Sequence, residues 1–238
     1  ALLATVMMMA APVVANAHGG DEAAFHSLPA ATAPTLKLDV TAQDGGFLVH
    51  MTTTNFTWAD APEVGGFVSG SGIARVYFDD VKFAKVYGPE FFLAPDVFAP
   101  IPGEHSIVVA LAGADMVSYA SDGVEVETSV NVSTPAPAGP GATPIDSDSF
   151  AMEVTPDRFG GFTVSGTPGV NVSVDGILYT RTLGFPVHVA ESERGVSAGP
   201  HELTFTAPTS TGDVLATTVQ YSGGTLSADV PSSVNWWW

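Results

Sequence analysis

The stretch that decides the fold is Val124-Glu125-Val126-Glu127-Thr128-Ser129-Val130-Asn131-Val132. Apolar or β-branched residues occupy every second position of this run, and polar residues stand between them. A period of two places alternate side chains on opposite faces of an extended chain, which predicts a strand with one buried face. The same period recurs at Leu36–Val40, at Phe47–Met51 and, far along the chain, at Val170–Val174. We therefore predict an all-β protein made of short antiparallel strands.

The composition agrees with this prediction and excludes several classes of protein. Of 238 residues, 25 are glycine and 18 are proline, which favours many short strands and turns over long helices. Lys and Arg number 7 against 25 Asp and Glu, so the formal net charge is −18. A surface this acidic repels a phosphate backbone, which argues against nucleic-acid binding. Because the chain has no cysteine, it has no disulfide, no thiolate metal site and no cysteine nucleophile.

The first 17 residues are interpreted as the apolar part of a cleaved signal peptide. Residues 1–14 are nearly all apolar, but the run is shorter than the ~20 residues that a membrane-spanning helix needs. It ends in Ala15-Asn16-Ala17, which fits the pattern of a signal cleavage site. A buried core helix is the alternative. No later run of 18 apolar residues occurs, so we expect a periplasmic or secreted protein without a membrane span in the mature chain.

A stretch rich in proline, glycine and alanine divides the rest of the chain. Residues 133–144 carry no charge, and their composition is typical of a semi-rigid extended linker. We predict a mobile N-terminal segment at 18–34 and a C-terminal tail at 233–238. Between these we expect a β-sandwich domain at 35–132, the linker at 133–146 and a second β-sandwich domain at 147–232.

The two predicted domains also resemble each other in sequence, which indicates an internal duplication of a ~90-residue sandwich unit. Asp175-Gly176, inside one of the matching segments, favours a type I′ hairpin turn. His105 and His201 occupy equivalent places after a turn and before a strand, so we expect both to be structural. The matching segments are Leu38–Phe47 with Met152–Phe162, Arg75–Asp80 with Ser173–Gly176, and Pro102–Ile107 with Gly199–Leu203.

The other histidines are the candidate metal ligands. After cleavage at Ala17, His18 would offer both an amino group and an imidazole, and this pair of nitrogens suits Cu(II). His26 and His50 could complete a copper site with it. The alternative is that His18 is merely the first mature residue and that His26 belongs to a disordered tether. His188 has apolar neighbours on a predicted strand and is expected to face solvent.

Four segments of the first predicted domain carry a resemblance to a known group of proteins. They are Gly46–Phe56, Gly72–Asp80, Lys85–Leu93 and Pro102–Met116. Over residues 18–132 the chain resembles exported bacterial Ig-like and PEGA-like β-sandwich proteins with the motifs G-H-A-H-L-Y-V-D-G, Y-G-P-W-Y-H-L and P-G-E-H. The resemblance implies Ig-like sandwiches outside the cytoplasm. With the duplication, we expect two tandem Ig-like antiparallel β-sandwich domains.

Most histidines of those motifs are replaced in this chain. Their positions hold Ile73, Arg75, Phe92 and Met116. Isoleucine, arginine and phenylalanine cannot replace imidazole as a metal ligand, whereas the Met116 thioether could bind Cu(I). If the histidines of the group hold a metal, this chain keeps only His50 and, loosely, His18 and His26.

The sequence has no phosphate-binding loop and no H-E-x-x-H. Asp79-Asp80 and Asp146-Ser147-Asp148 lack the rest of a Ca²⁺ loop and are expected to be turns. Glu125 and Glu127 are expected on a solvent face. The sequence favours a non-enzymatic, exported binding or structural module that contacts an envelope protein or a surface ligand. A periplasmic copper-binding protein is the alternative.

Overall fold

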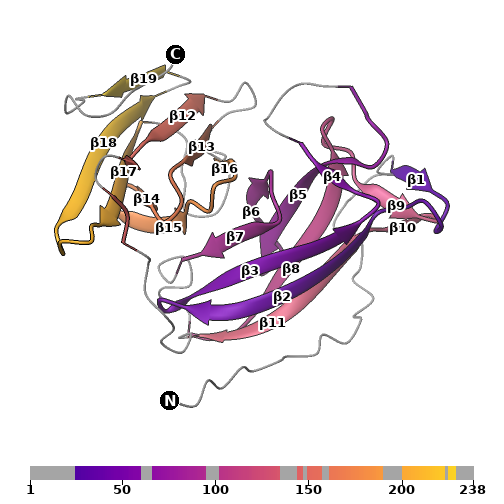
Figure 1. The fold of residues 1–238 in the computed structure, drawn as a ribbon. Helices are drawn as coiled ribbons and strands as arrows, with labels where there is room; N and C mark the ends of the chain where they lie inside the picture. Colours follow the sequence, from indigo (N-terminus) through magenta and orange to yellow (C-terminus); the bar gives the residue numbers. More distant parts are fainter. Residues whose placement is uncertain are drawn as a thin grey trace.

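The computed structural model describes residues 25–59, 66–94, 102–134, 144–146, 149–156, 161–189, 200–222 and 225–228. The predicted signal peptide, His18, most of the predicted linker and the C-terminal tail lie outside these residues. The described chain folds into β-strands joined by turns, and almost all strand pairs are antiparallel (Figure 1). The predicted all-β fold is confirmed. Among the described residues, no helix has the length and apolar character needed to cross a bilayer.

The first unit is a sandwich of two sheets. Its strands are β2 (Thr35–Gln43), β3 (Gly46–Thr54), β5 (Ser71–Phe78), β6 (Val81–Val86), β7 (Glu90–Leu93), β8 (Gly103–Gly113) and β11 (Glu127–Thr134). One sheet has the order β2-β3-β7, and the other has the order β11-β8-β5-β6. Alternate side chains of the strands fill the space between the sheets, as their period predicts. This unit is an Ig-like sandwich of seven strands.

The second unit repeats this arrangement strand for strand. Its strands are β12 (Met152–Pro156), β13 (Phe162–Gly166), β14 (Asn171–Val174), β15 (Ile177–Arg181), β16 (Val187–Val189), β17 (His201–Pro208), β18 (Val214–Ser222) and β19 (Thr225–Ala228). The orders β12-β13-β16 and β15-β14-β17-β18 match those of the first unit, and β19 adds one strand at an edge. The sheet orders therefore support the duplication inferred from sequence.

The histidines at equivalent positions make the same contacts in both units. The Nδ1 atom of His105 lies 2.7 Å from Asp79 Oδ2, and that of His201 lies 2.7 Å from Asp175 Oδ2. In each unit the second oxygen of the aspartate accepts the N–H of the residue after the histidine, at 3.0 and 2.9 Å. Each aspartate thereby ties a hairpin turn to the start of a neighbouring strand. The predicted structural role of His105 and His201 is confirmed.

The Asp79-Asp80 pair forms the turn between β5 and β6, as expected. Both residues have positive φ, at 47° and 64°, which is the conformation of a type I′ turn. Because Asp79 holds His105 and the N–H of Ser106, its carboxylate serves the fold. The second expected turn, Asp146-Ser147-Asp148, lies mostly outside the described residues.

A seam joins the two units through one continuous sheet. Strand β6 of the first unit pairs antiparallel with β16 of the second, with Val86 opposite Val187 and Lys85 opposite His188. The sheet order is consequently β11-β8-β5-β6-β16-β13-β12, which runs from one unit into the other. On the opposite side of the core, β15 lies beside β7. The division into separate domains at 35–132 and 147–232 stays a prediction, but the core is shared.

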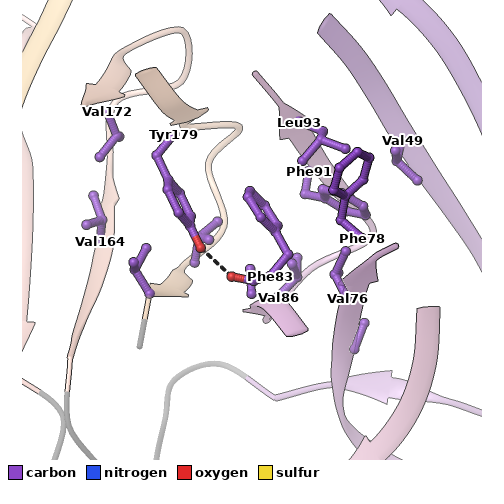
Figure 2. Packing of buried hydrophobic residues seen from close by; sticks show 14 of the residues in the cluster. Val49, Val76, Phe78, Phe83, Val86, Phe91, Leu93, Val164, Val172 and Tyr179 are labelled. Atoms are coloured by element: carbon purple, nitrogen blue, oxygen red, sulfur yellow. Dashed lines mark hydrogen bonds between the residues drawn. The ribbon is translucent and has the colours of Figure 1, made fainter. Parts of the chain in front are cut away.

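Aromatic side chains occupy the centre of this seam. The rings of Phe83 and Tyr179 stack at 4.6 Å between centroids with planes 9° apart, and the Tyr179 hydroxyl donates to the Phe83 carbonyl (Figure 2). Both side chains are almost fully buried. Figure 2 shows residues of the second unit, such as Val164 and Val172, on one side of this pair and those of the first unit on the other. One apolar cluster therefore spans both halves of the chain.

Two buried cations lie in the same seam. Lys85 and Arg181 stand 96 positions apart in equivalent strands, and each is only 6% exposed. The guanidinium of Arg181 lies 4.6 Å over the ring of Phe92 and pairs with Asp44 at 2.6 Å, whereas Lys85 faces His188 across the paired strands. Burying a charge is costly without such partners. Both cations are therefore held in the interior, away from the surface.

Two sequence-based expectations are corrected here. His188 was expected to face solvent, but it is 0% exposed. It lies on β16, between β6 and β13, and all three residues of this strand are buried, so both of its faces are covered. The mobility of the segment 18–34 stays a prediction; its described part contains the strand β1 (His26–Leu28) and the buried Ala33. Ser133 and Thr134, assigned to the linker, belong to β11.

Candidate functional site

The two units differ most at one end of the sandwich. In the first unit 16 residues, 55–70, connect β3 to β5, whereas residues 167–170 make the same connection in the second. Residues 114–126 connect β8 to β11, whereas residues 209–213 connect β17 to β18. The long connections add β4 (Thr57–Trp58), β9 (Tyr119–Ser121) and β10 (Val124–Glu125) to the scaffold. In sandwiches of this kind, the corresponding connections lie together at one end and commonly carry binding residues.

We call β1 together with residues 55–59, 66–70 and 114–126 the elaborated end. Strand β1 pairs parallel with β9, and β10 pairs with β9 on its other side. In Figure 1 these three strands lie together at the side of the first unit that faces away from the second. Neither β1, β4, β9 nor β10 has a counterpart among the described strands of the second unit.

Tyr119 holds the two long connections together. Its hydroxyl lies 2.9 Å from the Val68 carbonyl and 2.8 Å from the Ser71 carbonyl, and it accepts the N–H of Ser71 at 3.1 Å. Burial raises the pKa of Tyr119, and the nearby Asp115 carboxylate acts in the same direction. The phenol is therefore neutral at physiological pH. Its hydroxyl links the two long connections through hydrogen bonds.

His26 anchors the N-terminal segment to this end. Its ring stacks on Phe67 with centroids 3.6 Å apart, and its Nε2 lies 2.8 Å from Asp115 Oδ2. The His26 N–H donates to the carbonyl of Ser118 at 2.9 Å. These contacts hold β1 against the two long connections. No sequence signal pointed to the Asp115 contact, because the two residues are 89 positions apart.

A polar network connects strand β5 to the elaborated end. Arg75 on β5 donates to Glu125 Oε1 at 3.2 Å and to the Ser118 hydroxyl, which itself donates to Glu125 at 2.6 Å. The side chain of Glu125 is only 12% exposed. The expectation that Glu125 lies on a solvent face is therefore wrong. Glu127 begins the next strand, β11, and is half-buried.

Apolar side chains stay exposed around this framework. Phe67 is 40% exposed, Val68 is 62% exposed and Val124 is 69% exposed. Phe56 and Trp58, which are partly buried, continue the aromatic group, with their rings 5.1 Å apart and edge-on. Because exposed apolar side chains gain by burial, these residues make this loop end a candidate for contact with a partner.

The candidate metal ligands do not gather in the described structure. His26 lies in the sheet β1-β9-β10, whereas His50 lies on β3 in the sheet β2-β3-β7. His50 contacts Glu90 at 3.0 Å, and no group of three or more His, Asp or Glu side chains suited to a metal occurs in the part of the chain that the structure describes. Because His18 lies outside that part, the copper site stays a prediction.

The positions of the replaced histidines fall in three environments. Ile73 is fully buried in a small apolar cluster with Tyr87 and Ala112, and Met116 packs against that cluster. Arg75 belongs to the network with Glu125. Phe92 lies in the seam below Arg181. The Met116 side chain thus has apolar neighbours. Its role as a Cu(I) ligand stays a prediction.

The surface is more acidic than the net charge alone indicates. The described residues include five Lys and Arg: Lys37, Arg75, Lys82, Lys85 and Arg181. Among these five, Lys85 and Arg181 are buried, Arg75 is paired with Glu125 and only Lys37 is exposed. Interior positions therefore remove positive charge from a surface that keeps most of the carboxylates. Such a surface attracts cationic molecules and repels anionic ones.

No protein-family model and no curated protein matches the chain. Among solved structures, the central fibronectin-III array of RIM-binding protein matches with a TM-score of 0.26 and 13% identity, over 84% of this chain and 71% of that one. A Ca²⁺-stabilized adhesin that helps an Antarctic bacterium bind ice matches with a TM-score of 0.24 and 16% identity, over 80% of this chain and 49% of that one. At these TM-scores, neither match informs function.

Proposed function

We propose that the protein is an exported, non-catalytic binding module of the cell envelope, and that the elaborated end carries its binding surface. One observation carries this proposal. Of two units with the same sheet order, only the first has long connections at one end, and that end exposes Phe67, Val68 and Val124. A connection that served only to link strands would need no more than the short turns of the second unit.

The seam supports a role for the second unit in this module. It gives the first unit a buried neighbour along β6 and β7, so that the scaffold behind the elaborated end is rigid. A binding surface built on a rigid scaffold loses less entropy when it binds. The export of the chain rests on the signal peptide predicted from sequence, and N-terminal mass spectrometry of the protein from producing cells tests it.

Binding is tested with the full chain and isolated envelopes of the producing cells. We expect the chain to sediment with the envelopes. We expect the double variant Val68→Glu/Val124→Glu to lose most of this binding. The matched control is Val214→Glu, because Val214 is 67% exposed beside the short connection of the second unit. If the control variant loses binding as much as the double variant does, or if the wild-type chain stays in solution, the proposal is wrong.

A further inference from the structure

From the turn between β9 and β10 we infer that Asp122-Gly123 is a site of spontaneous covalent modification, at which the aspartate isomerises to isoaspartate. The inference goes beyond the proposed function and does not depend on it. In this reaction the backbone nitrogen of the following residue attacks the aspartate side chain. Glycine hinders that attack least, because it has no Cβ. The sequence contains three Asp-Gly pairs, at 44–45, 122–123 and 175–176.

The three pairs share one backbone conformation. Asp44, Asp122 and Asp175 have φ angles of 49°, 49° and 50°, and the glycines that follow them have φ angles of 77°, 84° and 79°. Positive φ at both central residues is the conformation of a type I′ turn, and each pair closes a hairpin. The backbone therefore does not distinguish the three pairs, so the surroundings of each carboxyl group decide which pair reacts.

Partners hold the carboxylate in two of the pairs. Asp44 Oδ2 lies 2.6 Å from Arg181, which is buried in the seam. Asp175 accepts the N–H of Glu202 at 2.9 Å and contacts His201 at 2.7 Å. Either carboxyl group would have to leave these partners before it could meet the glycine nitrogen. Breaking one hydrogen bond to a charged group slows a reaction about tenfold or more.

The third pair has an unrestrained carboxylate at an exposed hairpin tip. The hydrogen bonds and ion pairs among the described residues include none to the Asp122 carboxylate. Asp122 and Gly123 are both exposed, and a Cβ atom added at Gly123 would meet nothing within 4 Å. A cyclic intermediate therefore has room to form. The Gly123 N–H donates to the Ser27 hydroxyl at 3.2 Å, and this is the hydrogen bond that the attack must break.

The reaction needs no reagent other than water. The Gly123 nitrogen bonds to Asp122 Cγ and loses its proton, while the carboxyl group loses its hydroxyl, so one water leaves and a succinimide ring forms. A second water then opens the ring. Opening between the nitrogen and Cγ restores aspartate. Opening between the nitrogen and the former peptide carbon leaves the main chain running through Cβ and Cγ, which is isoaspartate of unchanged mass.

Isoaspartate at this position would loosen the strands around the turn. It adds one carbon atom to the main chain of a two-residue turn whose geometry suits ordinary peptide links. The Asp122 N–H donates to the Leu28 carbonyl at 3.0 Å, and the Gly123 N–H donates to Ser27, so the turn also holds β1. We expect isomerisation to weaken both contacts and to speed hydrogen exchange at the Asp122 amide.

The test follows the full chain during prolonged incubation at neutral pH. After digestion, fragmentation of the peptides by electron transfer measures isoaspartate at each Asp-Gly pair. We expect isoaspartate to form at Asp122 at least about tenfold faster than at Asp44 or Asp175. In guanidinium, where the partners are lost, the three rates should approach one another. Equal rates in the folded chain, or a slower rate at Asp122, would overturn the inference.

A variant with the same charge tests the effect on β1. Asp122→Glu would have to form a less favourable six-membered ring, so it should accumulate no isomerised residue at this position. Hydrogen exchange at this amide should then stay constant during incubation, whereas it should rise in the wild type as isoaspartate accumulates. A rise of the same size in Asp122→Glu would show that the turn loosens for another reason, and it would contradict the link between isomerisation and β1.

Discussion

Phe83 and Tyr179 occupy the same position in the two units and stack directly on each other. They are separated by 96 residues in sequence, and so are Asp79 and Asp175, which close the hairpin turns next to them. When equivalent residues meet in one contact, the two units are related by an approximate two-fold axis close to that contact. The pairing of β6 with β16 on one side and the packing of β15 beside β7 on the other fit this relationship. The chain therefore folds as an internal dimer of unequal halves.

We expect Tyr179→Ala to destabilise the whole chain. The side chain is 2% exposed and fills the centre of the shared core, so its removal should lower the free energy of unfolding by about 3–5 kcal/mol. Urea unfolding followed by tryptophan fluorescence and by circular dichroism measures this loss. The matched control Ile177→Ala, on the same strand but 43% exposed, should change stability little. Two separate transitions in the wild-type chain, one for each unit, would contradict a shared core.

We expect Gly88→Ala to strain the seam. A Cβ atom at Gly88 would lie 2.1 Å from the Phe185 ring, which belongs to the second unit, so either the ring or the backbone must shift. This overpacking should cost about 1–3 kcal/mol of stability. Gly66→Ala is the control, because a Cβ there meets nothing within 4 Å. In a double-mutant cycle, Phe185→Ala should reduce the cost of Gly88→Ala; strictly additive losses would show that the two residues do not meet.

Asp175 should make the chain less stable in acid. Burial by itself raises the pKa of Asp175, but the N–H of Glu202 and then the contact with His201 outweigh it, so that the pKa is lowered from its ordinary value of 3.8. A lowered folded-state pKa contributes stability that is present above pH ~4 and is lost as the pH falls through the folded value. In Asp175→Asn the free energy of unfolding should vary less with pH below about 4 than in the wild type. Equal slopes for the two chains would contradict this role.

Copper titration separates the candidate histidines. His50 and His26 lie in different sheets, so we expect His50→Ala to leave the Cu(II) affinity of the full chain unchanged within twofold. His26→Ala removes the Phe67 stack and the Asp115 contact, and it should release β1, which hydrogen exchange at Ser27 and Leu28 detects. A tenfold loss of Cu(II) affinity in His50→Ala would show that His50 is a ligand and would favour the copper-binding alternative.

Much of the fold could be predicted from the sequence, because it follows from local pattern. The alternation at Val124–Val132 predicted a strand, although the chain divides there between β10 and β11, and Asp175-Gly176 predicted its hairpin. His105 and His201 were recognised as structural because a duplicated sequence places them after the same turn. These features depend on residues that are near in the chain or on the repeat itself.

The seam could not be predicted in the same way. Strands β6 and β16 pair through backbone atoms about a hundred residues apart, and neither Val86 nor Val187 carries a sign of that partner. His188 is buried because β16 is covered on both faces in the seam, whereas its neighbours in sequence indicated a strand with one exposed face. The elaborated end did leave a signal, because the connections of the first unit are longer than those of the second. That signal becomes visible when the two copies are compared connection by connection.

The pairing of β6 with β16 also sets an order of events during synthesis. The chain is made from its N-terminus, so β6 is complete about a hundred residues before Val187 of its partner strand exists. During that interval the first unit has an unpaired strand edge beside a half-covered aromatic core, which is the kind of surface on which nascent chains aggregate. Contacts this distant in sequence also form slowly. The first unit is therefore prone to aggregation until the second unit has been synthesised. A translational pause between the two units would prolong this exposure.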